Sequence, residues 1–276
     1  MPVNSLRRSA AKALLIALAV LALVSACVHW REGNHGSHPE TNPRYLVGEL
    51  GGMKVNIPRY YVELVEYEGD PGWSGKRDAP KPIRTHQSRI NSFGVTVRYP
   101  DMAGLSSSAM RADKRQYTSA NTPWISVGFI SGSIYPGDGF LDRMAKYVID
   151  SDARHSSDVF KREALDLYGG LDLYVQQGTT INGRPRREIE SDVYIHQDGD
   201  GRVKAYIDCS NAKFPGVLCL HAFSMESDGL KVWVKIMYRR SMLVHWQDLQ
   251  ERVRRLILSW RAVETSPPAP SAASVP

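Results

Sequence analysis

DVYIHQDGDGRVKAYIDCSNAKFPGVLCLHAFSMESDGLKVWVKIMY, residues 192–238, predicts two β-hairpins in succession, and the architecture of the chain can be built outward from them. The first hairpin joins 192–197 to 202–209 through Asp198-Gly199-Asp200-Gly201, and Asp-Gly pairs supply the positive φ of tight turns. The second joins 217–225 to 230–238 through Ser227-Asp228-Gly229. Hairpins pair antiparallel strands, so this half of the chain predicts an antiparallel sheet.

The strand at 230–238 also predicts which side chains are buried. Successive strand residues point to opposite faces of a sheet, so residues two apart share a face. One face holds Leu230, Val232, Val234, Ile236 and Tyr238, and the other holds Lys231, Trp233, Lys235 and Met237. The purely apolar face is expected to lie against the core.

The same pattern recurs toward the N-terminus. Further hairpins are predicted at 45–57, around Gly51-Gly52, and at 164–176, around Gly169-Gly170. Alternating apolar residues predict single strands at 61–67, 93–99 and 124–130.

Three segments have helical spacing instead. The first is 106–117, with Ser106 to Ser108 as cap candidates, and the second is 140–149. That second segment places Phe140, Leu141, Met144, Tyr147 and Val148 on one face. The longest is 242–262, with a stripe of Met242, Trp246, Leu249, Val253, Leu256 and Trp260. We therefore predict an α+β fold: a twisted antiparallel sheet built from successive hairpins, with a long C-terminal helix and shorter helices packed on one face.

The N-terminus carries an export signal. Arg7, Arg8 and Lys12 precede an apolar run that is shorter than the roughly 20 residues a membrane-spanning helix needs. The run ends in Val24-Ser25-Ala26-Cys27, which resembles the bacterial lipoprotein box. The resemblance implies cleavage after Ala26 and acylation of Cys27. The alternatives are an ordinary cleaved signal or an uncleaved anchor with an incidental cysteine.

This reading divides the chain into parts. Residues 1–26 are the signal peptide, 27–44 a lipidated tether and 264–276 a disordered tail rich in Pro, Ala and Ser. Residues 45–263 form one α+β domain, and 155–160 is where it would divide if there were two sub-domains. Val28 after the acylated cysteine favours the outer membrane, by resemblance to the enteric sorting rule.

Composition and charge narrow the class of protein. The chain has 42% hydrophobic and 23% charged residues, which is typical of a globular protein. Its net charge of +6 falls to +3 when the three cations of residues 1–26 are removed. So small a charge does not predict binding of nucleic acid.

The cysteines agree with an oxidising compartment. There are three, and assigning Cys27 to the lipid leaves Cys209 and Cys219 as a pair. The periplasm would join them in a disulfide. The alternative is two free buried thiols.

The sequence lacks the common catalytic motifs. There is no G-x-S-x-G, no phosphate-binding loop and no H-E-x-x-H. Asp198-Gly199-Asp200-Gly201 opens like a calcium loop, but Cys209 stands where the closing glutamate should be. His196, His221 and His245 are isolated. We expect no enzyme, no metal site and no cofactor.

Two loops are candidates for binding a partner. One contains Tyr67, Asp70 and Trp73, and the other Tyr135 and Asp138. Aromatic residues among glycines and acids are typical of binding hot spots, and the alternative for Trp73 is a lid folded over the core.

The lipoprotein box and four further segments carry a family resemblance. They are 48–73, 92–102, 135–143 and 203–211. Together they resemble proteobacterial envelope lipoproteins, and in particular the immunity proteins encoded beside type VI secretion lipase effectors. The resemblance implies a periplasmic inhibitor that captures a secreted phospholipase.

Two other functions compete with this one. The chain could be a structural or accessory lipoprotein of a cell-envelope assembly, which would have stable partners in the producing cell. It could also be a periplasmic hydrolase with a dispersed site, which an activity screen would reveal.

Overall fold

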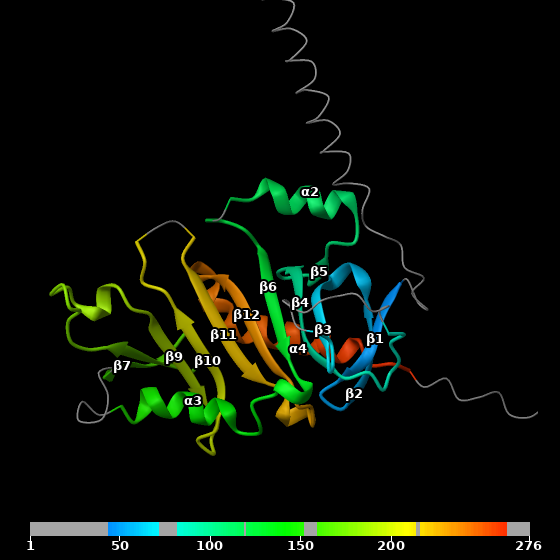
Figure 1. The fold of residues 1–276 in the computed structure, drawn as a ribbon. Helices are drawn as coiled ribbons and strands as arrows, with labels where there is room; N and C mark the ends of the chain where they lie inside the picture. The colour runs from blue at the N-terminus through cyan, green and yellow to red at the C-terminus, as the bar shows by residue number, and fades with distance from the viewer. Residues whose placement is uncertain (1–43, 72–81, 119, 152–158, 214–215, 264–276) are drawn as a thin grey trace, which may run out of the picture. The chain divides into compact units, whose positions relative to one another are not determined.

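The structure is a computed structural model that describes residues 44–71, 82–118, 120–151, 159–213 and 216–263. It has the predicted α+β class, with an antiparallel sheet, hairpins, a C-terminal helix and short helices (Figure 1). The predicted signal peptide, Cys27, Trp73 and the C-terminal tail lie outside the described residues.

The strands occupy most of the described chain. They are β1 (Tyr45–Leu50), β2 (Met53–Pro58), β3 (Val62–Tyr67), β4 (Ile90–Arg98), β5 (Ala103–Gly104), β6 (Trp124–Ile130), β7 (Phe160–Leu167), β8 (Leu171–Gln176), β9 (Asp192–Gln197), β10 (Val203–Cys209), β11 (Leu218–Ser224) and β12 (Trp233–Arg239). The α-helices are α2 (Ser108–Gln116), α3 (Phe140–Ile149) and α4 (Trp246–Ser259). Short 3-10 turns are η1 (Arg59–Tyr61), η2 (Gly132–Ile134), η3 (Arg186–Glu188), η4 (Glu226–Asp228) and η5 (Arg240–His245).

Ten strands form one sheet. Its order is β3-β4-β6-β12-β11-β10-β9-β8-β7, with β5 paired to β4, and neighbouring strands are antiparallel throughout. Strands from both sides of 155–160 therefore belong to the same sheet. β1 and β2 form a separate hairpin, whose β2 is bonded to the end of α4 through Asn56 N to Trp260 O at 2.8 Å.

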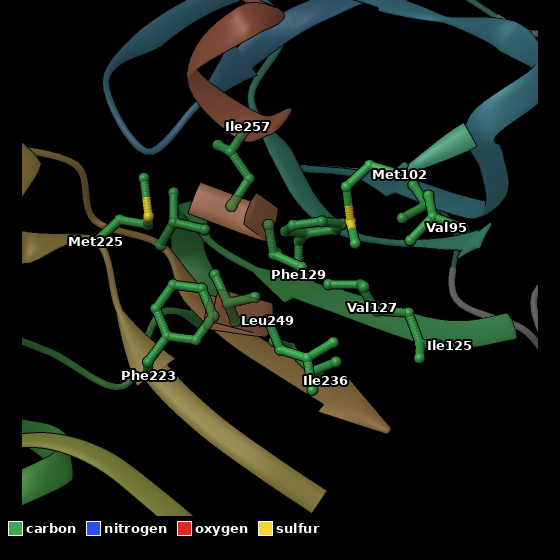
Figure 2. Close-up of a cluster of buried hydrophobic side chains, with 14 of the residues drawn as sticks. Val95, Met102, Ile125, Val127, Phe129, Phe223, Met225, Ile236, Leu249 and Ile257 are labelled. Atoms are coloured by element: carbon green, nitrogen blue, oxygen red, sulfur yellow. The ribbon is translucent and has the colours of Figure 1, made fainter. Parts of the chain in front are cut away.

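The main core lies between one face of the sheet and α4. Leu249 and Ile257 of α4 pack against Val127, Phe129 and Ile236 of the central strands (Figure 2). All five side chains are at most 1% exposed. The alternation predicted for 230–238 is confirmed, because its even-numbered residues all lie in this core.

The helices do not share one face of the sheet, which corrects the sequence-based expectation. Phe140, Leu141 and Val148 of α3 form a second cluster with Val193 and Ala222. Ala222 lies between His221 and Phe223 of β11, whose side chains are buried toward α4. Since neighbouring strand residues point to opposite faces, α3 covers the face opposite α4.

Two helix details also differ from the expectation. Tyr147 is 81% exposed, because the buried face of α3 centres on Leu141, Ala145 and Val148. The segment predicted as one helix from residue 242 begins with the turn η5, and the α-helix starts only at Trp246. Across the described residues, none of the helices combines the length and apolar character needed to cross a membrane.

Candidate functional site

One part of the sheet has no covering layer in the described structure. We call it the open face, and it lies on the side opposite α4, between α2 and α3 (Figure 1). Its residues come from the four strands β4, β6, β12 and β11. They are Gly94, Ser126, Gly128, Leu218, Leu220, Lys235 and Met237.

The strand register brings these residues together in two rows. Gly94 lies opposite Gly128, and Gly128 lies opposite Lys235. In the next row Ser126 lies opposite Met237, and Met237 lies opposite Leu220. Directly opposed residues point to the same side of a sheet and lie about 5 Å apart, so each row is a continuous strip of surface.

Several apolar side chains on this surface are exposed to solvent. Met237 is 43% exposed, Leu220 41% and Leu218 36%. Clustered apolar side chains in the middle of a sheet are usually covered, and exposed clusters with a polar rim mark interaction surfaces. Their neighbours one position along each strand, such as Ile236 and Cys219, are completely buried.

Lys235 is the cation of the open face. Its Nζ lies 3.8 Å from the centroid of the Trp233 ring, which is a cation–π contact. Partial burial, which desolvates the ammonium, lowers the pKa of Lys235. A partly desolvated ammonium on an aromatic ring is well placed to receive a carboxylate.

Helix α2 closes one end of the open face. Asp113 of α2 accepts hydrogen bonds from Trp124 Nε1 at 3.1 Å and from Arg98 Nη1 at 3.4 Å. The helix starts where predicted, with the Ser107 side chain accepting from Met110 N at 3.2 Å. At the other end, the ring of Phe140 in α3 lies 4.9 Å from that of Trp233.

The first predicted binding loop is built around buried groups. Tyr67 is only 6% exposed, and its hydroxyl donates to Val47 O at 2.7 Å, so its ring belongs to the core and is not an exposed contact. Asp70 accepts from Tyr67 N at 2.9 Å and pairs with Arg84. Tyr67 and Asp70 therefore make contacts within the chain, while Trp73 lies outside the described residues.

The second predicted loop is held by several hydrogen bonds and presents one acid. The Tyr135 hydroxyl donates to Glu226, and Gly139 N lies 3.1 Å from the same carboxylate oxygen, Oε1. Arg143 donates to the carbonyl oxygens of Pro136 and Asp138, both at 2.7 Å. Asp138 itself is exposed, so of this pair it is the side chain presented to solvent.

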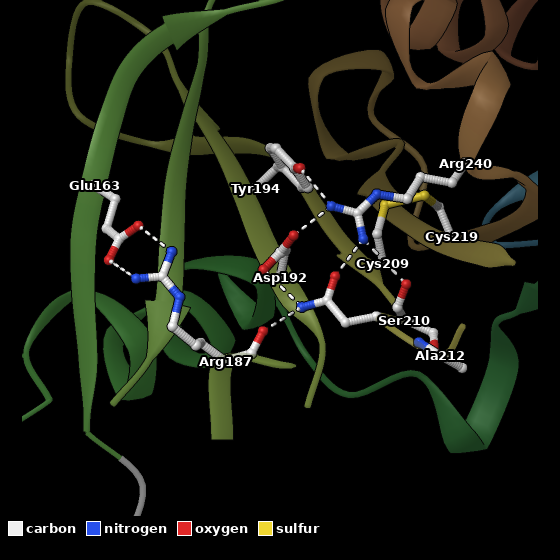
Figure 3. Close-up of polar contacts among 10 residues, drawn as sticks. Glu163, Arg187, Asp192, Tyr194, Cys209, Ser210, Ala212, Cys219 and Arg240 are labelled. Carbon is white, nitrogen blue, oxygen red and sulfur yellow. Dashed lines mark hydrogen bonds and ion pairs between the residues drawn. A yellow bond between two sulfur atoms is a disulfide. The ribbon is translucent and has the colours of Figure 1, made fainter. Parts of the chain in front are cut away.

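Cys209 and Cys219 form a disulfide between directly opposed positions of β10 and β11 (Figure 3). A polar network lies beside it. Arg240 pairs with Asp192 and donates to Tyr194 Oη at 3.1 Å, and Asn211 Nδ2 donates to Asp192 Oδ1 at 2.8 Å (Figure 3). The crosslink joins β10 to β11, and the network ties the ends of β9 and β10 to the end of β12.

The structure gives the isolated histidines structural partners. His221 bonds Gln250, His196 bonds Gly170 O at 2.7 Å, and the ring of His245 lies 5.8 Å from that of Tyr99. Asp198 closes a turn by accepting from Arg202 N at 2.9 Å. Within the described ranges, no three His, Cys, Asp or Glu side chains are grouped as metal ligands.

The open face was not among the sites predicted from sequence. The alternation of 230–238 did place Trp233, Lys235 and Met237 on one face, and glycine inside the strands at 93–99 and 124–130 is a signal of close approach by another group. What the sequence does not give is the register that brings these positions side by side.

The fold is shared with a solved structure, that of Smlt3025, an immunity protein of the Stenotrophomonas maltophilia type IV secretion system. The two chains are 20% identical, with a TM-score of 0.50, over 80% of this chain and 94% of that chain. At this identity the match shows a common fold. No protein-family model and no curated protein matches the sequence.

Proposed function

We propose that this chain is an immunity protein, which binds a secreted antibacterial effector in the periplasm and blocks it. The observation that carries the proposal is the fold shared with Smlt3025. Four sequence segments independently resemble immunity proteins encoded beside secreted lipases. An inhibitor of this kind acts by occupying its partner and needs no catalytic residues of its own.

The proposal includes the place of action. Acylation of Cys27 would anchor the chain to the envelope, with the outer membrane favoured by Val28. Several acyl chains anchor a protein stably where one does not. Tethering holds the inhibitor at the surface on which a phospholipase acts, and so raises its effective concentration there.

The effector is proposed to be a (phospho)lipase delivered by type VI secretion, following the family resemblance. The solved relative belongs to a type IV system, so the two lines of support agree on the kind of protein and differ in the secretion route. The alternative is a structural or accessory lipoprotein of an envelope assembly.

The test uses the gene next to the one encoding this chain. Its product is purified and assayed for hydrolysis of phospholipid vesicles and, separately, of peptidoglycan, with and without the full chain in detergent. We expect equimolar chain to bind this product and to suppress phospholipid hydrolysis. Suppression of peptidoglycan hydrolysis instead would refute the lipase assignment, and absence of binding would refute the immunity function.

A further inference from the structure

The fold does not require glycine at the centre of the open face. A Cβ built on Gly128 would meet no described atom of the chain within 4 Å, and one on Gly94 would lie 3.6 Å from Glu63 O, an ordinary contact. Neither residue has a positive φ. Glycine in the middle of a strand lowers stability relative to alanine, and it often marks a place where another backbone or a ligand comes close.

Two other glycines of the chain have an internal reason. Gly51 has φ of +56° and lies against Val232, with a built Cβ 2.6 Å from that side chain. Gly132 has the same φ, and its Cβ would lie 2.4 Å from Asn91 Oδ1. Gly94 and Gly128 have no such contacts or positive φ, and they lie directly opposite each other. The presence of glycine at both positions therefore points to a partner outside the chain.

The residues around the glycine pair indicate the chemistry of the group that would bind there. Leu220 and Met237 lie in the adjacent row and offer exposed apolar surface. Lys235 lies directly opposite Gly128, and none of the described carboxylates forms an ion pair with it. A group that docks here would therefore contact the exposed backbone of the two glycines, the apolar side chains of Leu220 and Met237, and the ammonium of Lys235.

The charges around the open face favour binding of an acidic partner segment. Arg98 already has carboxylates, Asp101 and Asp113, whereas exposed Lys114 and Arg115 of α2 have none in the described structure. Two acids work against this field: Asp208, which lies opposite Leu220, and the exposed Glu63, which lies opposite Gly94. The cations are nevertheless in excess between α2 and Lys235.

We propose that the open face docks a segment of the effector protein that carries a carboxylate between apolar side chains. The carboxylate pairs with Lys235, the apolar groups cover Leu220 and Met237, and the backbone of the segment lies over Gly94 and Gly128. This inference rests on the proposed function and names the surface and the chemistry of the partner. A pairing of this kind is strong because Lys235 is partly desolvated and braced by Trp233.

The experiment measures binding of the purified product of the neighbouring gene by titration calorimetry. The variants are Lys235→Met, Lys235→Glu, Lys235→Arg and Gly128→Ala. The matched control is Lys161→Glu, the same charge change at an exposed position of the edge strand β7, five strands away. Circular dichroism and the midpoint of urea unfolding establish that each variant is folded.

We expect Lys235→Met to weaken binding by about 30-fold, Lys235→Glu to weaken it further, and Lys235→Arg to retain most of it. Gly128→Ala should raise the unfolding midpoint, because a Cβ fits there, and yet weaken binding by about tenfold, because the same Cβ stands in the path of the partner. A residue with only a structural role would not separate stability from affinity in this way. Lys161→Glu should bind as the wild-type chain does.

Two results overturn the inference, and they differ. If the wild-type chain binds the partner and the Lys235 and Gly128 variants bind it equally well, docking lies elsewhere while the proposed function stands. If the wild-type chain does not bind the partner at all, the proposed function and this inference fall together.

Discussion

His221 on β11 is completely buried and donates a hydrogen bond from Nε2 to Gln250 Oε1 on α4, at 2.9 Å. The bond joins the sheet to the helix that covers its core. Nδ1 of the same ring is buried and has no partner among the described residues. The site therefore accepts a neutral imidazole and disfavours a protonated one.

The first prediction is a loss of stability in mild acid. Burial lowers the pKa of His221 from 6.5 to about 4. The unfolded chain keeps the ordinary pKa, so between these values it binds a proton that the folded chain does not. The contribution of His221 to the free energy of unfolding is therefore fully present above about pH 6.5. It falls by about 3 kcal/mol as the pH drops to about 4. Urea unfolding at a series of pH values measures this.

His221→Gln is the variant that checks the assignment. It should lose much of the acid-side slope, whereas His245→Gln, at an exposed position, should keep it. An unchanged slope in the His221 variant would show that other groups cause the acid sensitivity.

A second prediction concerns two tyrosine hydroxyls. That of Tyr238 is buried without a partner in the described structure, while that of Tyr67 donates to Val47 O at 2.7 Å. Tyr238→Phe should leave the free energy of unfolding unchanged or raise it, whereas Tyr67→Phe should lower it by about 1 kcal/mol. Equal losses in the two variants, measured by urea unfolding, would contradict the hydrogen-bond assignment.

The third prediction tests the crosslink. Cys209 and Cys219 are separated by 10 positions in sequence and are completely buried. Replacing both with alanine should lower the free energy of unfolding by about 3 kcal/mol, mainly because the unfolded chain is no longer constrained. Chemical reduction of the wild-type chain should have a similar effect, and free-thiol labelling of both cysteines in periplasmic protein would contradict the disulfide.

The fourth prediction separates support from contact in the loop at 135–139. Tyr135→Phe removes the hydroxyl that donates to Glu226, and should lower stability by about 1–2 kcal/mol. Asp138→Ala changes an exposed side chain and should leave stability unaltered while weakening effector binding. Unchanged affinity in the folded Asp138 variant would remove this loop from the binding surface.

Much of the fold could be predicted because its signals are local. Alternation in 230–238 and the glycine pairs at 51–52 and 169–170 fix strands and turns within a few residues of sequence. Strand β3, which contains Tyr67, shows where such reasoning fails. Leu64 has φ of +52° and the register of β3 shifts around it, so simple alternation does not apply to that strand.

Long-range pairing explains what could not be predicted. The placement of α3 opposite α4, and of Gly94 opposite Gly128, depends on the order and register of strands far apart in the chain. The sequence shows the two glycines and the residues that share a face with Lys235, but it does not show that they lie side by side. A site made of four strands becomes recognisable only in the assembled sheet.

The most direct measurement is a competition between bacteria. A strain lacking this gene is grown in contact with its parent, which still delivers the effector, and survivors are counted. The account predicts that the deletion strain is killed, that the wild-type chain restores its survival, and that Lys161→Glu restores it while Lys235→Glu does not. Equal survival of the deletion strain and its parent would contradict the account.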